Sequence, residues 1–375
     1  MSRDARWASD DPTHRAGPTR RVEYHDEYQT ARAEYGRSSG RPPRRPQRRP
    51  QRGGSRHGGR RVLITVVVVI LALVVGGYAY LDSQLGRVDA LADYSGRPAA
   101  TPGQDWLLVG SDSREGLTAE QRKEYSTGGG SGQRTDTIML LHIPSGGGKP
   151  TLVSLPRDSY VPIAGHGHNK LNAAFAWGGP RLLARTVESV TGIRVDHYAE
   201  VGFGGFVGVV DAVGGVKMCI EQPINDRRAG INLKKGCQKL NGAQALGYVR
   251  SRHAFASGDF ARVTHQRKFL GALFDKAASP GVLLNPFRVL PLMQNGVGAL
   301  TVADGDHLYN LVSVALAMRS VGSGDAVTTT VPVAGTTYAS GAGSVVEWNR
   351  TEALRLFNAL KEDKPVPKNV LSDSP

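Results

Sequence analysis

Cysteine is scarce in this chain: its 375 residues include only Cys219 and Cys237. No CxxC pair or close His pair accompanies them, so a structural zinc site is not indicated. The sequence also lacks a GxSxG elbow, a Walker A loop and a GxGxxG turn that opens a helix. Serine hydrolase, nucleotide-triphosphate and dinucleotide chemistry therefore have no support in the sequence.

Residues 1–61 contain no lysine and almost no Val, Leu or Ile. This segment holds 16 Arg and 7 acidic residues, so it carries a net charge of +9 out of the +14 of the chain. A segment rich in Arg, Pro, Gly, Ser and Gln cannot bury enough apolar surface to offset chain entropy, and we predict a disordered tail. Binding to nucleic acid or lipid is the alternative role of such an Arg run.

Charge is absent from residues 62–81, which lie between Arg61 and Asp82. A bilayer core needs roughly 20 apolar residues in a helix, and backbone polar groups in lipid must bond internally, so this Val-rich run predicts a transmembrane helix. No clear small-x-small site follows, which favours a signal anchor over a cleaved signal peptide. The preceding Arg excess predicts a single-pass protein of the cell membrane, with residues 1–61 cytoplasmic and the rest extracytoplasmic. In that oxidising compartment we expect a Cys219–Cys237 disulfide.

Beyond the span, composition predicts three regions. Residues 82–104 are expected to form a juxtamembrane linker, residues 105–362 a single domain, and residues 363–375 a frayed tail. Strands are expected near residues 106–109, 137–143, 151–155, 197–201 and 327–333, and helices near residues 182–190, 260–278 and 283–300. Strands and helices alternate along the domain, so the fold class is α/β or mixed α+β.

Short polar clusters, dominated by Arg and Asp, lie at the ends of these predicted elements. They contain Asp112 and Arg114, Arg134 and Asp136, Arg157 and Asp158, Arg250 and Arg252, and finally Asp259, Arg262 and Gln266. Residues two apart in an extended chain point the same way, and residues three or four apart share one side of a helix. Each cluster is therefore expected to present its polar groups together.

Several Arg with a few Asp fit a ligand that carries phosphate, because guanidinium forks match phosphate oxygens. Carboxylates are out of place in an anion site unless they hold a cation. Mg²⁺, with Mn²⁺ as the alternative, is the expected ion, since it is bound by one or two carboxylates together with substrate phosphates. Ion pairs that only stabilise the fold are the alternative explanation for these clusters.

The motifs that contain these residues occur in the order GSDSR, RTDTIMLLHI, LVSLPRDSYVPI, HNKLNAAFAWGGP, VDAVGG, LNGAQALGYVRSR and GDFARVTHQ. With an N-terminal anchor before them, this series resembles the LytR–CpsA–Psr family of cell-wall glycopolymer ligases. The resemblance covers roughly residues 105–360. It implies a central β-sheet flanked by helices, and a hydrophobic tunnel for a polyprenyl chain. It also implies transfer of a phosphate-linked glycan from a polyprenyl-pyrophosphate carrier to a sugar hydroxyl of peptidoglycan.

The resemblance also implies roles for individual residues. Asp112 and Asp136 match the magnesium-linked aspartates of the family. The positions that match its pyrophosphate contacts are Arg134, Arg157, Arg250, Arg252, Arg262 and Gln266. Other motif residues, whose roles stay open, are Arg114, Asp158, Lys170, Asn172 and Asp259. Two departures are a long loop between Asp112 and Asp136, and His265 where the family often has Arg.

Three other functions compete with a ligase. A module that binds lipid-linked glycans without chemistry would gain nothing from Asp112 and Asp136 in the absence of a metal. A pyrophosphatase would act on the same lipid with water as the acceptor. A nucleic-acid-binding regulator is disfavoured, because no helix-turn-helix pattern is present and the folded part is expected outside the cell. The identities of the glycopolymer, the acceptor sugar and the general base do not follow from the sequence.

Overall fold

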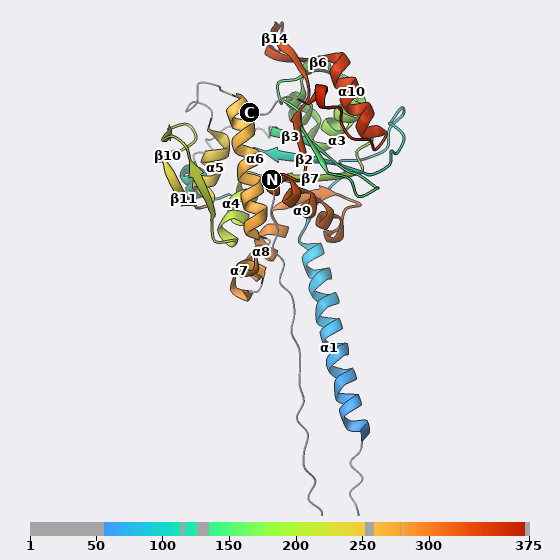
Figure 1. Ribbon diagram of the computed structural model, residues 1–375, viewed down its shortest axis with the longest axis vertical. Coiled ribbons are helices and arrows are strands. Elements are labelled where there is room, and N and C mark those ends of the chain that lie inside the picture. The colour runs from blue at the N-terminus through green and yellow to red at the C-terminus, as the bar shows by residue number, and fades with distance from the viewer. Residues whose placement is uncertain are drawn as a thin grey trace, which may run out of the picture. The chain divides into compact units, whose positions relative to one another are not determined.

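The computed structural model describes residues 56–113, 117–125, 135–251, 259–277, 279–283 and 285–371 (Figure 1). The predicted tail of residues 1–61 lies outside these ranges, apart from its last residues. Helix α1 (Arg56–Ser83) contains the charge-free segment. Its stretch Gly59–Ser83 is long and apolar enough to cross a membrane, and it is not buried against the rest of the protein. The structure thus contains one helix that fits a membrane anchor within the described part of the chain.

A seven-stranded mixed sheet forms the centre of the domain. Its strand order is β1-β12-β7-β2-β3-β4-β13. The bounds are β1 (Gly86–Val88), β12 (Leu300–Ala303), β7 (His197–Val201), β2 (Gln104–Ser111), β3 (Thr135–Ile143), β4 (Thr151–Ser154) and β13 (Val327–Thr330). Strand β2 runs parallel to β7 and antiparallel to β3, and β3 runs antiparallel to β4. The central strands are continuous apolar runs because both faces of the sheet are covered.

Alternate residues of the central strands face two helical layers. On one face, Leu107 and Leu140 share a buried cluster with side chains of α3 (Leu171–Thr191) and α10 (Arg350–Lys361). On the other face, Trp106 and Leu141 cluster with side chains of α6 (Asp259–Ala277) and α9 (Leu308–Ser323). Figure 1 shows α3 and α10 on the side of the sheet opposite to α9. The fold is therefore mixed α/β with a central sheet between helices, as the sequence predicted.

A third buried cluster lies beside the sheet and includes Val210, Tyr248 and Phe269. It joins α6 to α4 (Phe203–Ala212), α5 (Gly242–Arg250), α7 (Pro280–Leu283), α8 (Pro286–Val297) and two hairpins. The hairpins are β8 (Val216–Ile220) with β11 (Gly236–Leu240), and β9 (Ile224–Asp226) with β10 (Ile231–Leu233). Cys219 and Cys237 face each other across β8 and β11 and form a disulfide, as predicted.

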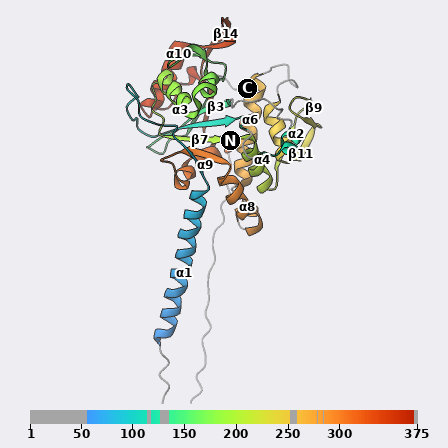
Figure 2. The same ribbon diagram turned by 180° about the vertical axis from the view of Figure 1, so that it is seen from behind.

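The remaining elements lie at the periphery of the sheet. They are α2 (Ala119–Glu124), the hairpin of β5 (Tyr160–Ile163) and β6 (Gly167–Lys170), the hairpin of β14 (Val333–Ala339) and β15 (Gly343–Trp348), and the 3₁₀ turn η1 (Lys368–Val370). Figure 2 shows β14 and α10 at the end of the domain away from α1.

Three expectations about element boundaries were wrong. Residues 86–88, assigned to a linker, form the edge strand β1, and Ala90 just after it is buried in the core. The helix expected over residues 283–300 is present as α8, but it is shorter, from Pro286 to Val297, and Leu300 already pairs with Val201 in the sheet. The segment after residue 363 is not frayed up to residue 371, because Val366 and Val370 are buried. In each case a few apolar residues gain partners from distant parts of the chain.

A buried polar network holds the end of α10 to the sheet. The His142 ring on β3 contacts Asp105 at 3.0 Å and Asp363 at 3.1 Å, and Ser145 donates to Asp363 through its backbone N–H at 3.1 Å. Burial lowers the pKa of His142, but the two carboxylates outweigh it and raise that pKa above its ordinary value. Asp363 has φ +53°, a left-handed conformation that Asp tolerates better than most residues.

Candidate functional site

The predicted polar clusters converge on one edge of the sheet because of strand direction. Strand β2 ends there, β3 begins there, and β4 ends there again. Ser111 pairs with Thr135 while Gly110 pairs with Thr137, so Asp136 is the extra residue of a β-bulge. A bulge bends the strand and turns its side chain away from the regular alternation. Asp136 and Asp112, the residue after β2, therefore lie at the ends of adjacent strands.

Arg157 connects the carboxylates at this edge. Its guanidinium donates to Asp136 through Nη1 and to Asp158 through Nε at 3.3 Å. Lys170 Nζ lies 2.9 Å from the other oxygen of Asp158. The side chains of Arg157 and Asp136 are 20% and 33% exposed, so a ligand has access to the pair. The structure thus joins four predicted residues of three separate motifs into one cluster of two cations and two anions.

The charges in this cluster reinforce one another. Burial raises the pKa of Asp158, but the hydrogen bond from Lys170 and the charge of Arg157 outweigh it and bring that pKa below its ordinary value. Burial also opposes the charge of Arg157, and Asp136 and Asp158 outweigh it and raise the pKa of the guanidinium. Asp158 and Arg157 therefore both stay ionised across the physiological range. Asp158, whose role the sequence left open, is paired with Arg157 and Lys170 in this geometry.

Backbone hydrogen bonds fix the turn that carries Arg157. The amide of Asn172 donates to Arg157 O at 3.0 Å, and the amide of Leu171 donates to Ser159 O at 2.9 Å. Both donors belong to the first turn of α3, where backbone N–H groups have no partner within the helix. The HNKLN motif therefore anchors the PRD motif, and the backbone of Asn172 is what contacts it.

Arg250 lies at the end of α5, whose start is capped by Asn241 and Gln244 in a capping box. Its Nη1 donates to Tyr125 O at 3.1 Å, and its guanidinium lies 4.7 Å from the centre of the Phe203 ring. The Phe203 amide in turn donates to Ser113 O at 3.2 Å, next to Asp112. Arg250 is thereby connected to the end of β2 through α4.

The loop after β2 fits closely against the start of α4. A Cβ at Gly202 would lie 3.3 Å from Ser113, which is a tight contact with the loop that carries Asp112. Gly202 follows the last residue of β7 and precedes Phe203, whose ring supports Arg250. Sequence reasoning placed no functional weight on Gly202, Phe203 or Tyr125. Tyr125 acts through its backbone carbonyl, for which a sequence has no signature.

The remaining predicted residues are not located at the side-chain level. Arg114, Arg134 and Arg252 lie outside the described residues. Asp259, Arg262 and Gln266 belong to helix α6, of which the backbone alone is described at these positions. Their predicted contacts with a ligand stay predictions.

The donor set at the sheet edge suits a hard cation. Asp112 and Asp136 supply carboxylate oxygens at adjacent strand ends, and Mg²⁺ needs only one or two carboxylates if substrate phosphates and water complete its shell. Among the described residues there is no group of three or more His, Cys, Asp or Glu side chains that could hold a metal alone. The residues thus fit an ion that binds together with a phosphate-bearing ligand.

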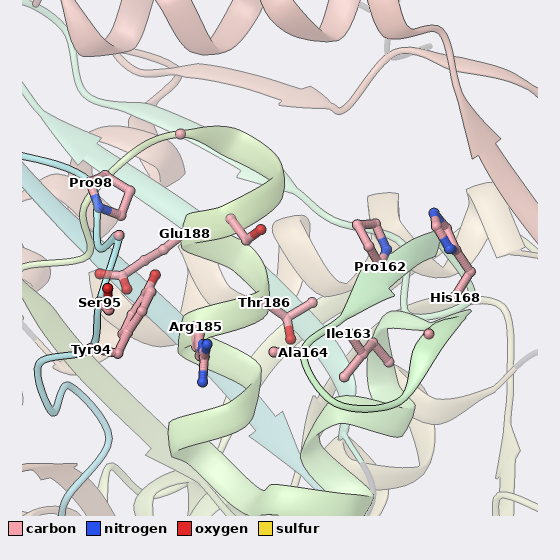
Figure 3. A pocket seen from close by; sticks show the side chains of 14 residues that line it. Tyr94, Ser95, Pro98, Pro162, Ile163, Ala164, His168, Arg185, Thr186 and Glu188 are labelled. Atoms are coloured by element: carbon pink, nitrogen blue, oxygen red, sulfur yellow. The ribbon is translucent and has the colours of Figure 1, made fainter.

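A separate cavity of about 450 Å³ lies between residues 94–98, helix α3 and the β5–β6 hairpin (Figure 3). None of the predicted site residues lines it. Glu188 inside it is paired with Arg97 at 3.0 Å and accepts from the amide of Val195 at 3.0 Å, which holds the loop to the domain. Burial and the Glu188 carboxylate raise the pKa of Tyr94 to about 12. The Glu188 contacts therefore support the fold at this cavity.

Comparison with known proteins agrees with this arrangement. Residues 87–362 match the sequence model of the LytR_cpsA_psr family. Two Corynebacterium glutamicum proteins are similar over most of the chain. Probable cell wall biosynthesis protein LcpB is 51% identical over 284 residues (75% of this chain), and cell wall biosynthesis protein LcpA is 32% identical over 350 residues (81% of this chain). The matched part spans 66% of each of these proteins, slightly less than two thirds of their length.

Solved structures share the fold. A LytR-Csp2A-Psr enzyme from Actinomyces oris superposes with a TM-score of 0.55 and 23% identity, over 74% of this chain and 96% of that one. TagT bound to LIIa-WTA gives a TM-score of 0.51 and 23% identity, over the same shares of the two chains. The family match covers well over half of the chain and includes every motif at the sheet edge. This chain belongs to the LytR–CpsA–Psr family and is related to proteins of cell wall biosynthesis.

Proposed function

We propose that this protein is a phosphotransferase that moves a phosphate-linked glycopolymer from a polyprenyl-pyrophosphate carrier to a sugar hydroxyl of peptidoglycan. The observation that supports it best is the Arg157 cluster, which presents cations and carboxylates at one partly exposed edge of the sheet. The names of the relatives point to cell wall biosynthesis, and TagT of the same fold was solved with the ligand LIIa-WTA.

The proposed reaction exchanges one P–O bond for another. The acceptor hydroxyl oxygen bonds to the phosphorus that carries the glycan, and the bond from that phosphorus to polyprenyl phosphate breaks. Polyprenyl phosphate leaves with the electron pair, and the acceptor proton passes to a carboxylate, Asp112 or Asp136. The products are a glycan phosphodiester on peptidoglycan and a lipid monophosphate.

The residues of this chain mainly position and stabilise charge. Arg157 and Arg250 hold oxygens of the pyrophosphate, with Lys170 adding positive charge, so that the leaving phosphate is stabilised as its charge grows. Phosphoryl transfer needs little covalent help from a protein if the acceptor oxygen is held in line. A magnesium ion on Asp112 and Asp136 would neutralise further phosphate charge when it is bound. Arg114, Arg134, Arg252, Asp259, Arg262 and Gln266 are proposed to complete this site.

Membrane placement belongs to the same proposal. The lipid carrier is confined to the bilayer, and α1 would hold the domain beside it with the Arg-rich tail in the cytoplasm. Protease added to cells with a permeabilised wall is expected to digest the chain after Asp82 and spare residues 1–61. The reverse protection pattern would place the domain where no peptidoglycan is available.

One assay separates the ligase from its two main competitors. The full chain in vesicles is incubated with glycan-labelled polyprenyl-pyrophosphate lipid and with peptidoglycan. A ligase moves the label to peptidoglycan, a pyrophosphatase releases it as water-soluble glycan phosphate, and a binding module leaves it on the lipid. Label that stays on the lipid, with the protein folded and metal present, would refute the proposed reaction.

A further inference from the structure

Helix α9 is apolar on two opposite sides. Among its 16 residues Arg319 is the only charged one. Val314, Ala317 and Met318 are buried in the cluster with Trp106 under the sheet. On the outer side, Tyr309, Val312 and Leu316 are 61%, 55% and 60% exposed. A helix that is apolar on all sides is normally buried on all sides. The exposed outer side of α9 is therefore expected to contact an apolar environment.

The outer side of α9 forms a continuous stripe. Tyr309, Val312, Leu316 and Arg319 follow one another at spacings of three, four and three residues, which places them on one face. The stripe begins with a tyrosine and ends with an arginine, both of them exposed. Tyr is enriched at the membrane interface, and Arg keeps its charged end in water or on phosphate while its stem lies on apolar surface.

The end of α1 is bound directly to the start of α9. One Asp82 oxygen accepts from the backbone amide of Leu308 at 2.9 Å, and the other lies 2.9 Å from Nδ1 of His307. Arg87 contacts the same carboxylate at 2.6 Å. Asp82 thus caps α9 from outside the helix, and it is the first charged residue after the apolar segment of α1. If α1 spans the bilayer, α9 starts at its surface.

Helix α8 adds to the same end of the domain. Figure 1 shows α7, α8 and α9 at the end from which α1 departs, and Figure 2 shows α8 and α9 there as well. Phe287 in the first turn of α8 is 88% exposed, and Met293 two turns later is 39% exposed. The exposed Tyr338, by contrast, belongs to the β14–β15 hairpin at the far end.

We propose that the outer face of α9 (Tyr309, Val312, Leu316 and Arg319), with Phe287 of α8, lies in the membrane interface. The occupant of this apolar surface is the lipid bilayer that holds α1, and the inference rests on the membrane placement proposed above. Interfacial helices bury their apolar face ~5–10 Å into the boundary between headgroups and acyl chains. The domain is then fixed against the bilayer at two points, the α1–Asp82 junction and the α9 face, rather than suspended on a flexible stalk.

The test uses the full chain in phospholipid vesicles. Because the native cysteines form a disulfide, a single introduced cysteine can be labelled selectively. Val312→Cys and Leu316→Cys carry an environment-sensitive fluorophore, and Tyr338→Cys is the matched control on an exposed site. Lipids that carry a quencher near the top of the acyl chain are added. Emission at residues 312 and 316 is expected to fall about twofold or more, and emission at residue 338 to stay unchanged.

The outcomes separate this inference from the proposed function. A quencher attached to lipid reports lipid contact only, so a protein partner or a second copy on the face would leave emission unquenched and overturn the inference. If labelled protein floats with vesicles and transfers glycan but residues 312 and 316 are not quenched, the inference alone fails. If the protein does not float with vesicles, the anchor and the inference fail together. Leu316→Asp should reduce the quenching at Val312→Cys severalfold, with circular dichroism as the folding control.

Discussion

Replacing Arg157 by lysine keeps the positive charge and removes the planar fork. In the structure the guanidinium reaches Asp136 through Nη1 and Asp158 through Nε, from two sides of one group. A lysine ammonium is a single point on a flexible stem, and Lys170 already occupies the other side of Asp158 at 2.9 Å. Arg157→Lys is therefore expected to keep one of the two contacts and to lose the other.

The size of the effect follows from the contact that is lost. A hydrogen bond to a charged group contributes roughly 1.5–3 kcal/mol, and about 1.4 kcal/mol corresponds to tenfold in rate. Glycan transfer by Arg157→Lys should accordingly fall about ten- to a hundredfold. The Asp136 and Asp158 contacts aim the guanidinium, and in the proposed site its remaining N–H groups hold the pyrophosphate. Because that contact with the lipid strengthens as charge moves onto the leaving polyprenyl phosphate, the loss should appear in turnover more than in affinity for the lipid. A module that only binds the lipid would lose affinity for the lipid and would have no turnover to lose.

The assay measures lipid binding and glycan transfer on the same protein in vesicles. Arg181→Lys is the matched control, because Arg181 forms an ion pair with Asp89 at 3.5 Å while its side chain is 61% exposed. Exposed pairs contribute little, so this variant should stay within about twofold of the unmodified protein. Wild-type transfer by folded Arg157→Lys, together with wild-type transfer by Arg250→Lys, would remove the described arginines from the mechanism and refute the reasoning.

Three further predictions test the metal, the disulfide and the polar network of α10. Asp136→Asn should abolish stimulation of transfer by Mg²⁺ while preserving the circular dichroism spectrum, and full activity in excess chelator would contradict the metal role. Reducing the Cys219–Cys237 disulfide should cost about 3 kcal/mol in the chain-entropy account of a loop of this length, seen as a lower denaturant midpoint; an unchanged midpoint would speak against it. Asp363→Asn should lower the unfolding free energy by about 1–2 kcal/mol at pH 5 and by less at pH 8. The pKa of His142 is raised in the folded protein, so its contribution is present below the unfolded pKa of about 6.5 and is lost as pH rises through the folded value. An equal loss at both pH values would contradict this account.

The central strands could be predicted because their signal is local. Residues 106–109 and 138–141 are apolar throughout, which is typical of strands covered on both faces. Strand β1 and the β9–β10 hairpin were missed, because three-residue strands have too few positions for a pattern and depend on their partners. The start of α3 was missed for a different reason. Gly178 and Gly179 interrupt its helical geometry, and in the sequence they read as a loop, so the helical turns before them were not predicted.

The composition of the site was easier to predict than its pairing. Arg and Asp at element ends indicated an anion site with a cation, but the sequence did not show that Arg157 takes both Asp136 and Asp158. Which carboxylate pairs with which arginine depends on distances of a few ångströms. The residue types in a sequence do not contain those distances. The contact of Arg250 with a backbone carbonyl and the Phe203 ring shows the same limit.

The convergence of the clusters, by contrast, follows from strand parity. In an antiparallel series the end of the first strand, the start of the second and the end of the third lie at one edge of the sheet. Asp112 follows β2, Asp136 is the second residue of β3 and Arg157 follows β4, so three motifs spread over residues 110–158 are brought together by two connections between antiparallel strands. Strand β7 is parallel to β2 and so delivers Phe203 to the same edge, at the cost of a long crossover through α3. Strand direction does not predict where α5 and α6 lie, because these helices are not directly connected to a strand end at this edge of the sheet. The positions of the arginines on these helices could not be predicted from the sheet. Mutating these arginines and measuring ligand binding will therefore be the most informative test of the site.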